Sequence, residues 1–121
     1  MAAVAVVDAD ADRRELVARV LEADGHTVTR LAGGEEARSL VESGDARPDV
    51  VVVQVAVVGD AERALVASLR GDGGGGDGTR VVVIGRSRGT AEAAGADSAL
   101  GRPIHADDLR RTVAGLLAGD N

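Results

Sequence analysis

Short apolar runs alternate along the chain with segments in which apolar residues recur every three or four positions. The first pattern predicts buried strands, and the second predicts helices with one apolar face. The predicted strands are Val4–Val7, His26–Leu31, Val50–Val53, Val81–Ile84 and a brief Ser98–Leu100. The predicted helices are Arg13–Ala23, Gly34–Ser43, Asp60–Arg70 and Ala106–Leu117.

The order of these elements indicates an α/β fold. Val50–Val53 is β-branched throughout and has no polar alternation, which is typical of a central parallel strand covered on both faces. Strands that alternate with helices imply right-handed crossovers and a doubly wound parallel sheet. Only nine residues separate Gly85 from Gly95, so the fourth helix is expected to be shortened to about one or two turns.

Composition narrows the class of protein. The length of 121 residues suits a single domain spanning 1–121, and the absence of cysteine excludes disulfides and thiolate metal sites. The chain lacks aromatic residues, and all 14 basic residues are arginine against a net charge of -6. An acidic chain without stacking side chains is not expected to bind nucleic acid directly. No apolar run is long enough to cross a membrane and no signal peptide is visible, so a cytoplasmic protein is expected.

A glycine-rich segment, Gly71–Thr79, formally contains the spacing of a dinucleotide-binding loop. It follows a predicted helix and precedes a strand, which is the reverse of the order that such a loop requires. We interpret it as a surface linker. The alternative is a turn of a calcium-binding repeat with Asp72 and Asp77 as ligands, although such turns need stacked neighbours.

Three aspartates at alternate positions, Asp8, Asp10 and Asp12, have the spacing of the first ligands of an EF-hand loop. Arg13 occupies the position where that loop needs glycine, so calcium binding is not expected here. Asp12 is expected to cap the first helix together with Glu15, and Asp10 to be solvated. Asp8 ends a buried strand, where a carboxylate has no evident structural purpose.

Catalytic machinery is not visible in the sequence. His26 and His105 lack a partner at ligand spacing and are expected at the surface. With no cysteine and no serine in a strand-to-helix elbow, the chain is not expected to be an enzyme.

Several segments together resemble the response-regulator receiver domains. They are Val6–Asp8, Pro48–Val53, Gly59, Gly95–Asp97 and Arg102–Pro103, in the order and at the spacing of that family. The resemblance covers essentially the whole chain. It implies a flavodoxin-like sheet of five parallel strands in the order 2-1-3-4-5, with a phosphoryl-accepting Asp at the end of the third strand.

The resemblance also implies that the phosphorylation site is degenerate. The family's acidic pair, which binds Mg²⁺, falls on Asp8 and Ala9, so one of its carboxylates is missing, and the family's phospho-acceptor falls on Gln54. The switch hydroxyl falls on Gly85, and the family's lysine falls on Arg102. These substitutions would leave a receiver that cannot accept a phosphoryl group.

We therefore expect a phosphorylation-independent signalling module that binds a protein partner. The alternatives are an N-terminal input domain of a longer transcription regulator, or a small-anion binder that uses Gln54 and Arg102 in the vacated pocket. No cofactor or metal is expected, Asp8 and Asp10 being only weak metal candidates. Arg102 is predicted to pair with the buried Asp8, with Gln54 hydrogen bonded beside them.

Overall fold

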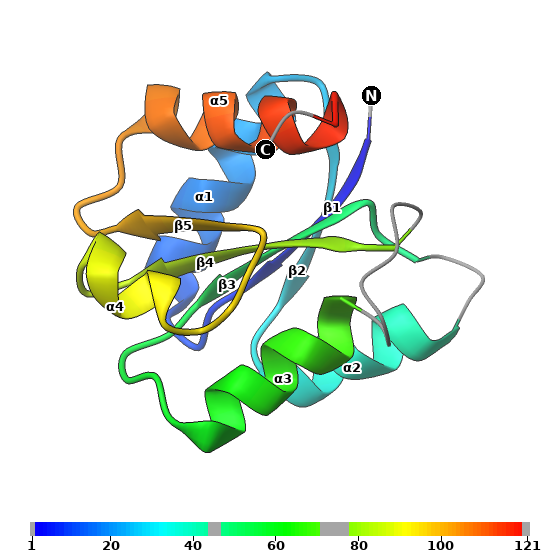
Figure 1. Ribbon diagram of the computed structural model, residues 1–121. Helices are drawn as coiled ribbons and strands as arrows, with labels where there is room; N and C mark the ends of the chain where they lie inside the picture. Colours follow the sequence, from blue (N-terminus) through cyan, green and yellow to red (C-terminus); the bar gives the residue numbers. More distant parts are fainter. Residues whose placement is uncertain (1, 44–46, 71–77, 120–121) are drawn as a thin grey trace.

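A computed structural model describes residues 2–43, 47–70 and 78–119, and in these residues five strands form one parallel sheet (Figure 1). The strands are β1 (Ala3–Val7), β2 (Thr27–Leu31), β3 (Val50–Gln54), β4 (Arg80–Gly85) and β5 (Ser98–Gly101). The helices are α1 (Ala11–Ala23), α2 (Gly34–Ser43), α3 (Asp60–Arg70), α4 (Arg88–Glu92) and α5 (Ala106–Leu117). The sheet order β2-β1-β3-β4-β5 confirms the predicted flavodoxin-like topology.

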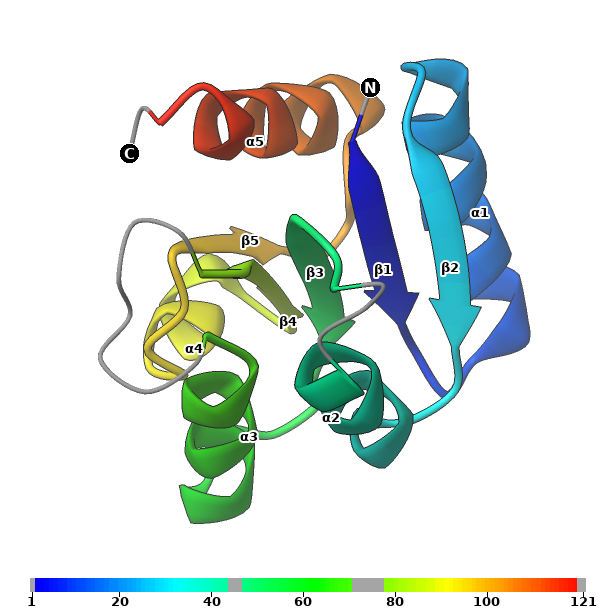
Figure 2. The same ribbon diagram turned by 90° about the vertical axis from the view of Figure 1, so that its right-hand side faces the viewer.

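Helices cover both faces of the sheet and create two cores (Figures 1 and 2). On one face α1 and α5 pack against alternate strand residues such as Val6 and Val52. On the other face α2, α3 and α4 pack against the strand residues that lie between those of the first set, such as Val7 and Val53. Because β3 is buried along its first four residues, valine with its branched side chain can fill both cores without any aromatic group.

Most predicted boundaries agree with the structure. The helices at 34–43, 60–70 and 106–117 are confirmed, and the predicted short fourth helix is present as the five-residue α4. The predicted start of α1 was wrong, because the N-cap of this helix is Asp10 and not Asp12. Asp10 is extended and its carboxylate accepts hydrogen bonds from the main-chain N–H groups of Asp12 and Arg13, so the helix begins two residues early.

His26 lies in a less exposed place than predicted. Gly25, with φ +95°, reverses the chain after α1, and the main-chain N–H of His26 donates to the Leu21 carbonyl. Only 9% of the His26 side chain is exposed, and its Nε2 lies 3.9 Å from Oδ2 of Asp24. His105 is exposed, as predicted, at the start of α5.

Two further predictions concern the glycine-rich segment and the absence of a membrane-spanning helix. The glycine-rich linker, together with its alternative ligands Asp72 and Asp77, lies outside the described residues except for its last two positions. Among the described helices, none is long and apolar enough to cross a membrane.

Candidate functional site at the carboxyl edge of the sheet

The residues singled out from the sequence gather at one edge of the sheet. Gln54 ends β3 and Gly85 ends β4, while Asp8 follows β1 closely and Arg102 follows β5. Parallel strands place their carboxyl ends at a common edge, where ligands of doubly wound sheets bind. The fold therefore brings positions from across the whole chain to this edge.

Asp8 is the only one of these residues that carries a buried negative charge. Its side chain is 2% exposed, and it is bound by Arg13 at two points: Nε donates to Oδ2 over 3.0 Å and Nη2 to Oδ1 over 3.1 Å. The main-chain N–H of Asp10 also donates to Oδ1, over 2.8 Å. The Asp8 carboxylate raises the pKa of Arg13, because its hydrogen bond favours the charged guanidinium. Asp8 is thus neutralised within its own segment of the chain.

The geometry of the first turn of α1 places Arg13 over Asp8. The carboxylate of Asp10 accepts the Arg13 N–H over 3.0 Å, which fixes the start of the helix at Ala11 and places Arg13 in its first turn, five residues after Asp8. That backbone hydrogen bond is the main cause of the lowered pKa of Asp10. Arg14 adds a fourth hydrogen bond to Asp8, since its Nη1 donates to the main-chain carbonyl of Asp8 over 2.8 Å.

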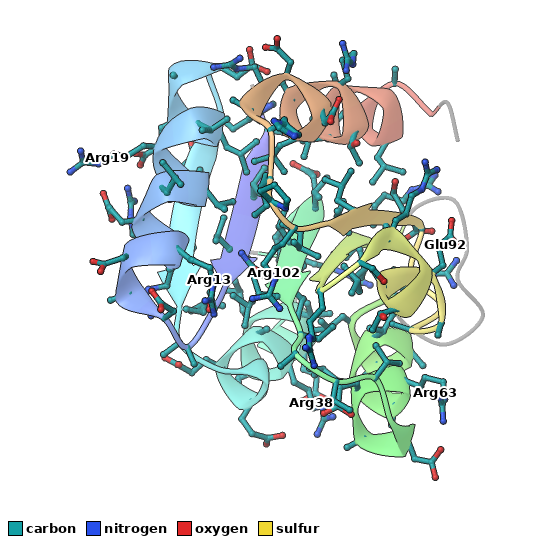
Figure 3. All side chains as sticks on the ribbon, turned by 90° about the vertical axis from the view of Figure 1, so that its left-hand side faces the viewer. Arg13, Arg19, Arg38, Arg63, Glu92 and Arg102 are labelled. Atoms are coloured by element: carbon teal, nitrogen blue, oxygen red, sulfur yellow. The ribbon has the colours of Figure 1, made fainter. Side chains whose placement is uncertain are left out.

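The predicted direct pair between Asp8 and Arg102 was wrong. Both Asp8 oxygens accept hydrogen bonds from residues of its own segment, so Arg102 is not needed there. The main-chain N–H of Arg102 donates to the Gly85 carbonyl over 3.0 Å, and its Nε is buried without a hydrogen-bond partner. Figure 3 shows Arg13 at the start of α1 and Arg102 on the chain that leaves β5, two separate elements.

Gln54 does not join a polar network either, contrary to the prediction. Its Oε1 and Nε2 atoms are both buried and have no partner among the described residues. Gln54 lines an open hollow of about 360 Å³ whose wall also includes Asp8, Ala9 and Ala56. An amide with an unused donor and acceptor is costly in a buried position unless water or a ligand satisfies it.

Gly85 leaves little room for a side chain. A Cβ at this position would lie 3.1 Å from the main-chain N of Ala91 in α4. Gly101 at the end of β5 is tighter still, because its Cβ would lie 2.5 Å from the main-chain N of Arg88. These two glycines let the backbone of α4 and of the segment before it lie directly on the ends of β4 and β5.

The residues present do not fit the divalent cation that the resemblance implies. Mg²⁺ prefers several hard oxygen ligands. Asp8 is paired with a guanidinium, Ala9 offers only a methyl group, and Asp10 caps α1. Across residues 2–43, 47–70 and 78–119, no group of three His, Asp or Glu side chains is arranged to hold a metal ion.

Sequence reasoning missed two arginines of this edge, Arg13 and Arg86. The contact of Arg13 with Asp8 could have been predicted, because Arg13 lies only five residues after Asp8, at the predicted start of the helix. Arg86 directly follows β4 at the same edge, and no spacing rule marked it.

Comparison with known proteins shows which solved structures share this fold. Neither the protein-family models nor the curated proteins contain a match. Solved structures do: the chemotaxis response regulator CheY4 of Vibrio cholerae is 24% identical, with a TM-score of 0.74 over 96% of this chain and 98% of that one. A putative pilus assembly-related protein from Burkholderia pseudomallei is 22% identical, with a TM-score of 0.78 over 100% of this chain and 92% of that one.

A third similar structure is NtrX from Brucella abortus in complex with ADP. It is 27% identical with a TM-score of 0.77, and the match covers 98% of this chain but 27% of NtrX. Other matching structures include response regulators and signal receiver domains. This chain has the fold of the response-regulator receiver domains.

Proposed function

We propose that this chain is a phosphorylation-independent receiver module of the cytoplasm that signals by binding a protein partner and has no enzymatic activity. The observation that carries the proposal is the ion pair of Asp8 with Arg13, beside Gln54 at the end of β3. The Arg13 guanidinium is bound to the Asp8 carboxylate, which a metal ion would need as a ligand. An amide stands where the resemblance expects the phosphoryl acceptor.

The chemistry of an acyl phosphate supports this proposal. A carboxylate oxygen is an effective nucleophile toward phosphorus. The oxygen of the Gln54 amide shares its electrons with the neighbouring nitrogen and carries no full negative charge. A divalent cation that could offset this weakness would have to displace Arg13 from both oxygens of Asp8.

Close packing at the ends of β4 and β5 supports a single conformation. In a switching receiver, a side chain at position 85 would have to move between two places. Here Gly85 has no side chain, and the backbone at Ala91 occupies the space next to it. This close packing supports a single arrangement of α4 on the ends of the strands.

Exposed apolar side chains support the role of a binding module. Val57, in the connection after β3, is 67% exposed, and Leu16 on α1 is 63% exposed. Burial of such groups drives association between proteins. Val57 lies on the same edge of the sheet as Gln54, which favours this edge as part of the contact surface.

The test is the intact mass of the protein after incubation with acetyl phosphate and Mg²⁺. We expect no phosphoryl adduct on this chain, whereas a receiver with an acceptor Asp, treated in parallel, becomes modified. An Ala9→Asp/Gln54→Asp variant tests whether the acidic residues alone restore the reaction. A stoichiometric adduct on the unaltered protein would overturn the proposal.

Partner binding needs a separate measurement. A partner captured by the immobilised protein should be recovered equally with and without acetyl phosphate, and Val57→Asp should weaken its affinity. Arg19→Asp, on a side chain of α1 that points into solvent in Figure 3, is the control. If the module is instead the input domain of a longer transcription regulator, the partner is the output domain of the same protein.

A further inference from the structure

The Gln54 hollow, the open cavity of about 360 Å³ that Gln54 lines, has a mostly apolar wall. Most of its wall residues are valine, alanine, glycine or leucine. Small residues create the space, since Ala9 and Ala56 carry only a methyl group and a Cβ added at Gly33 would have no neighbour within 4 Å. The cavity is therefore an apolar recess among polar strand ends.

Main-chain hydrogen bonds hold the segments that form this wall. The N–H of Asp8 donates to the Leu31 carbonyl over 3.1 Å and joins the end of β1 to the end of β2. The N–H of Val55 donates to the Ile84 carbonyl over 2.9 Å and joins the segment after β3 to β4. The cavity is thus formed before anything enters it, which reduces the ordering cost of binding.

The polar groups of the wall are already bound or cut off from solvent. Asp8 is paired with Arg13, and Oε1 of Glu62 accepts the Gly59 N–H over 2.8 Å. The Gln54 amide is neutral, and both its polar atoms are buried, so a group that enters the cavity removes no water from them. An uncharged apolar group therefore enters at little desolvation cost.

Val57 extends the apolar wall of the Gln54 hollow onto the outer surface. Its side chain lines the cavity, and at 67% exposure it is the most exposed large apolar side chain among the residues that the structure describes. Ala56 beside it is exposed as well. A small solute in the cavity would leave Val57 in water, whereas a polypeptide with one projecting side chain covers both, as at the centres of protein interfaces.

We propose that the Gln54 hollow receives one aliphatic side chain, such as leucine or isoleucine, from a protein partner whose neighbouring residues cover Val57. This inference rests on the proposed function and names the chemistry of its partner. Burial of apolar surface on both sides supplies the affinity. A charged side chain is disfavoured, because it would lose water without gaining a free counter-ion while Arg13 is bound to Asp8.

The experiment selects peptides from a phage-displayed random library on the immobilised protein, without divalent cations. Binding of the enriched peptides is measured for the parent, for Ala9→Asp in the wall and for Val57→Ser at the rim. Ala114→Asp is the matched control, since it adds the same charge at an exposed alanine of α5, on the opposite face of the sheet. Intermolecular contacts to 13C-labelled valine and leucine methyl groups locate each peptide on the parent.

We expect the enriched peptides to share an aliphatic residue that contacts the methyl groups of Val55, Val57 and Leu65. Ala9→Asp and Val57→Ser should each weaken binding roughly tenfold, as expected for a charge without a partner and for a lost apolar contact. Replacement of the shared aliphatic residue by serine should weaken it similarly, and Ala114→Asp should bind as the parent does.

The proposal is overturned if no peptide is enriched, or if the enriched peptides share no aliphatic residue. It is also overturned if that residue contacts Leu16 and Ile104 between α1 and α5, or if Ala114→Asp weakens binding as much as Ala9→Asp. The acetyl phosphate test separates this result from the proposed function. A phosphoryl adduct on a protein that still binds the peptides would remove phosphorylation independence and leave the docking cavity in place.

Discussion

Arg13 binds both carboxylate oxygens of Asp8, with 3.0 Å between Nε and Oδ2 and 3.1 Å between Nη2 and Oδ1. The pair spans the turn that leads from β1 into α1. Its two members differ in surroundings, since the Asp8 side chain is 2% exposed and that of Arg13 is 42% exposed. Without Arg13 the buried Asp8 carboxylate would lack both a counter-ion and water, whereas Arg13 without Asp8 would still be hydrated.

Removal of Arg13 alone should destabilise the protein more than removal of the whole pair. Arg13→Gln leaves a buried carboxylate without its counter-ion, whereas Asp8→Asn/Arg13→Gln removes both charges. We expect a lower free energy of unfolding for the single variant than for the double variant, measured by urea denaturation. Arg63→Gln, which removes an ion pair with the exposed Asp60 on α3, serves as the control and should stay close to the parent. Equal stability of Arg13→Gln and the parent would show that the pair contributes nothing.

Magnesium should bind poorly to this edge of the sheet. Asp8 is the one buried carboxylate here and Arg13 already occupies both its oxygens, so a cation finds too few ligands. We expect no saturable amide shifts at Asp8 or Ala9 in sub-millimolar Mg²⁺. A variant with Ala9→Asp, Gln54→Asp and Arg13→Ala should gain affinity, since it supplies three free carboxylates. Saturation of the unaltered protein at that concentration would contradict the prediction.

The packing of α4 can be tested with two glycines that differ in their surroundings. Gly101→Ala places a methyl group 2.5 Å from the main-chain N of Arg88, and should lower the free energy of unfolding by about 1–3 kcal/mol through overpacking. Gly89→Ala, whose Cβ would have no neighbour nearer than 4.0 Å, should be neutral or stabilising by up to about 1 kcal/mol. Urea denaturation measures both. An identical effect of the two substitutions would argue against close packing at Gly101.

Acid should weaken the protein through Glu15 on α1. Hydrogen bonds from Arg30 and then Arg19 lower the pKa of Glu15 from its ordinary 4.5 to about 2. A carboxylate with a depressed pKa stabilises the fold above its unfolded pKa and loses that contribution as pH falls toward the folded value. The contribution of Glu15 should therefore be complete above about pH 4.5 and disappear between there and pH 2.

The measurement is urea denaturation at several pH values across this window for the parent and for Glu15→Gln. The variant should show the smaller decrease in stability as the pH falls, and high salt should reduce the difference because the cluster is exposed. Glu92→Gln, on a side chain 59% exposed with one longer ion pair, is the control. A 13C titration of Glu15 with its midpoint near 4.5 would disprove the coupling.

The pattern of apolar residues was sufficient to predict the order of the elements and the sheet. Three helices matched at both ends, because glycine, acidic first turns and the end of the apolar stripe mark such limits locally. The brevity of α4 followed from counting residues between Gly85 and Gly95. These properties depend on chain length and on which face of an element is apolar, and both are written in the sequence.

Only the tertiary structure decided which charged groups meet at the edge of the sheet. Arg13 and Arg102 both follow elements that end at the same edge of the sheet as Asp8, and the N-cap of α1 at Asp10 placed Arg13 in contact with Asp8. Arg102 was thereby left beside Arg86, a residue that no motif had indicated. Such pairings depend on a connection of three residues, 8–10, and on backbone hydrogen bonds between strand ends. Periodicity along the chain carries no information at that scale.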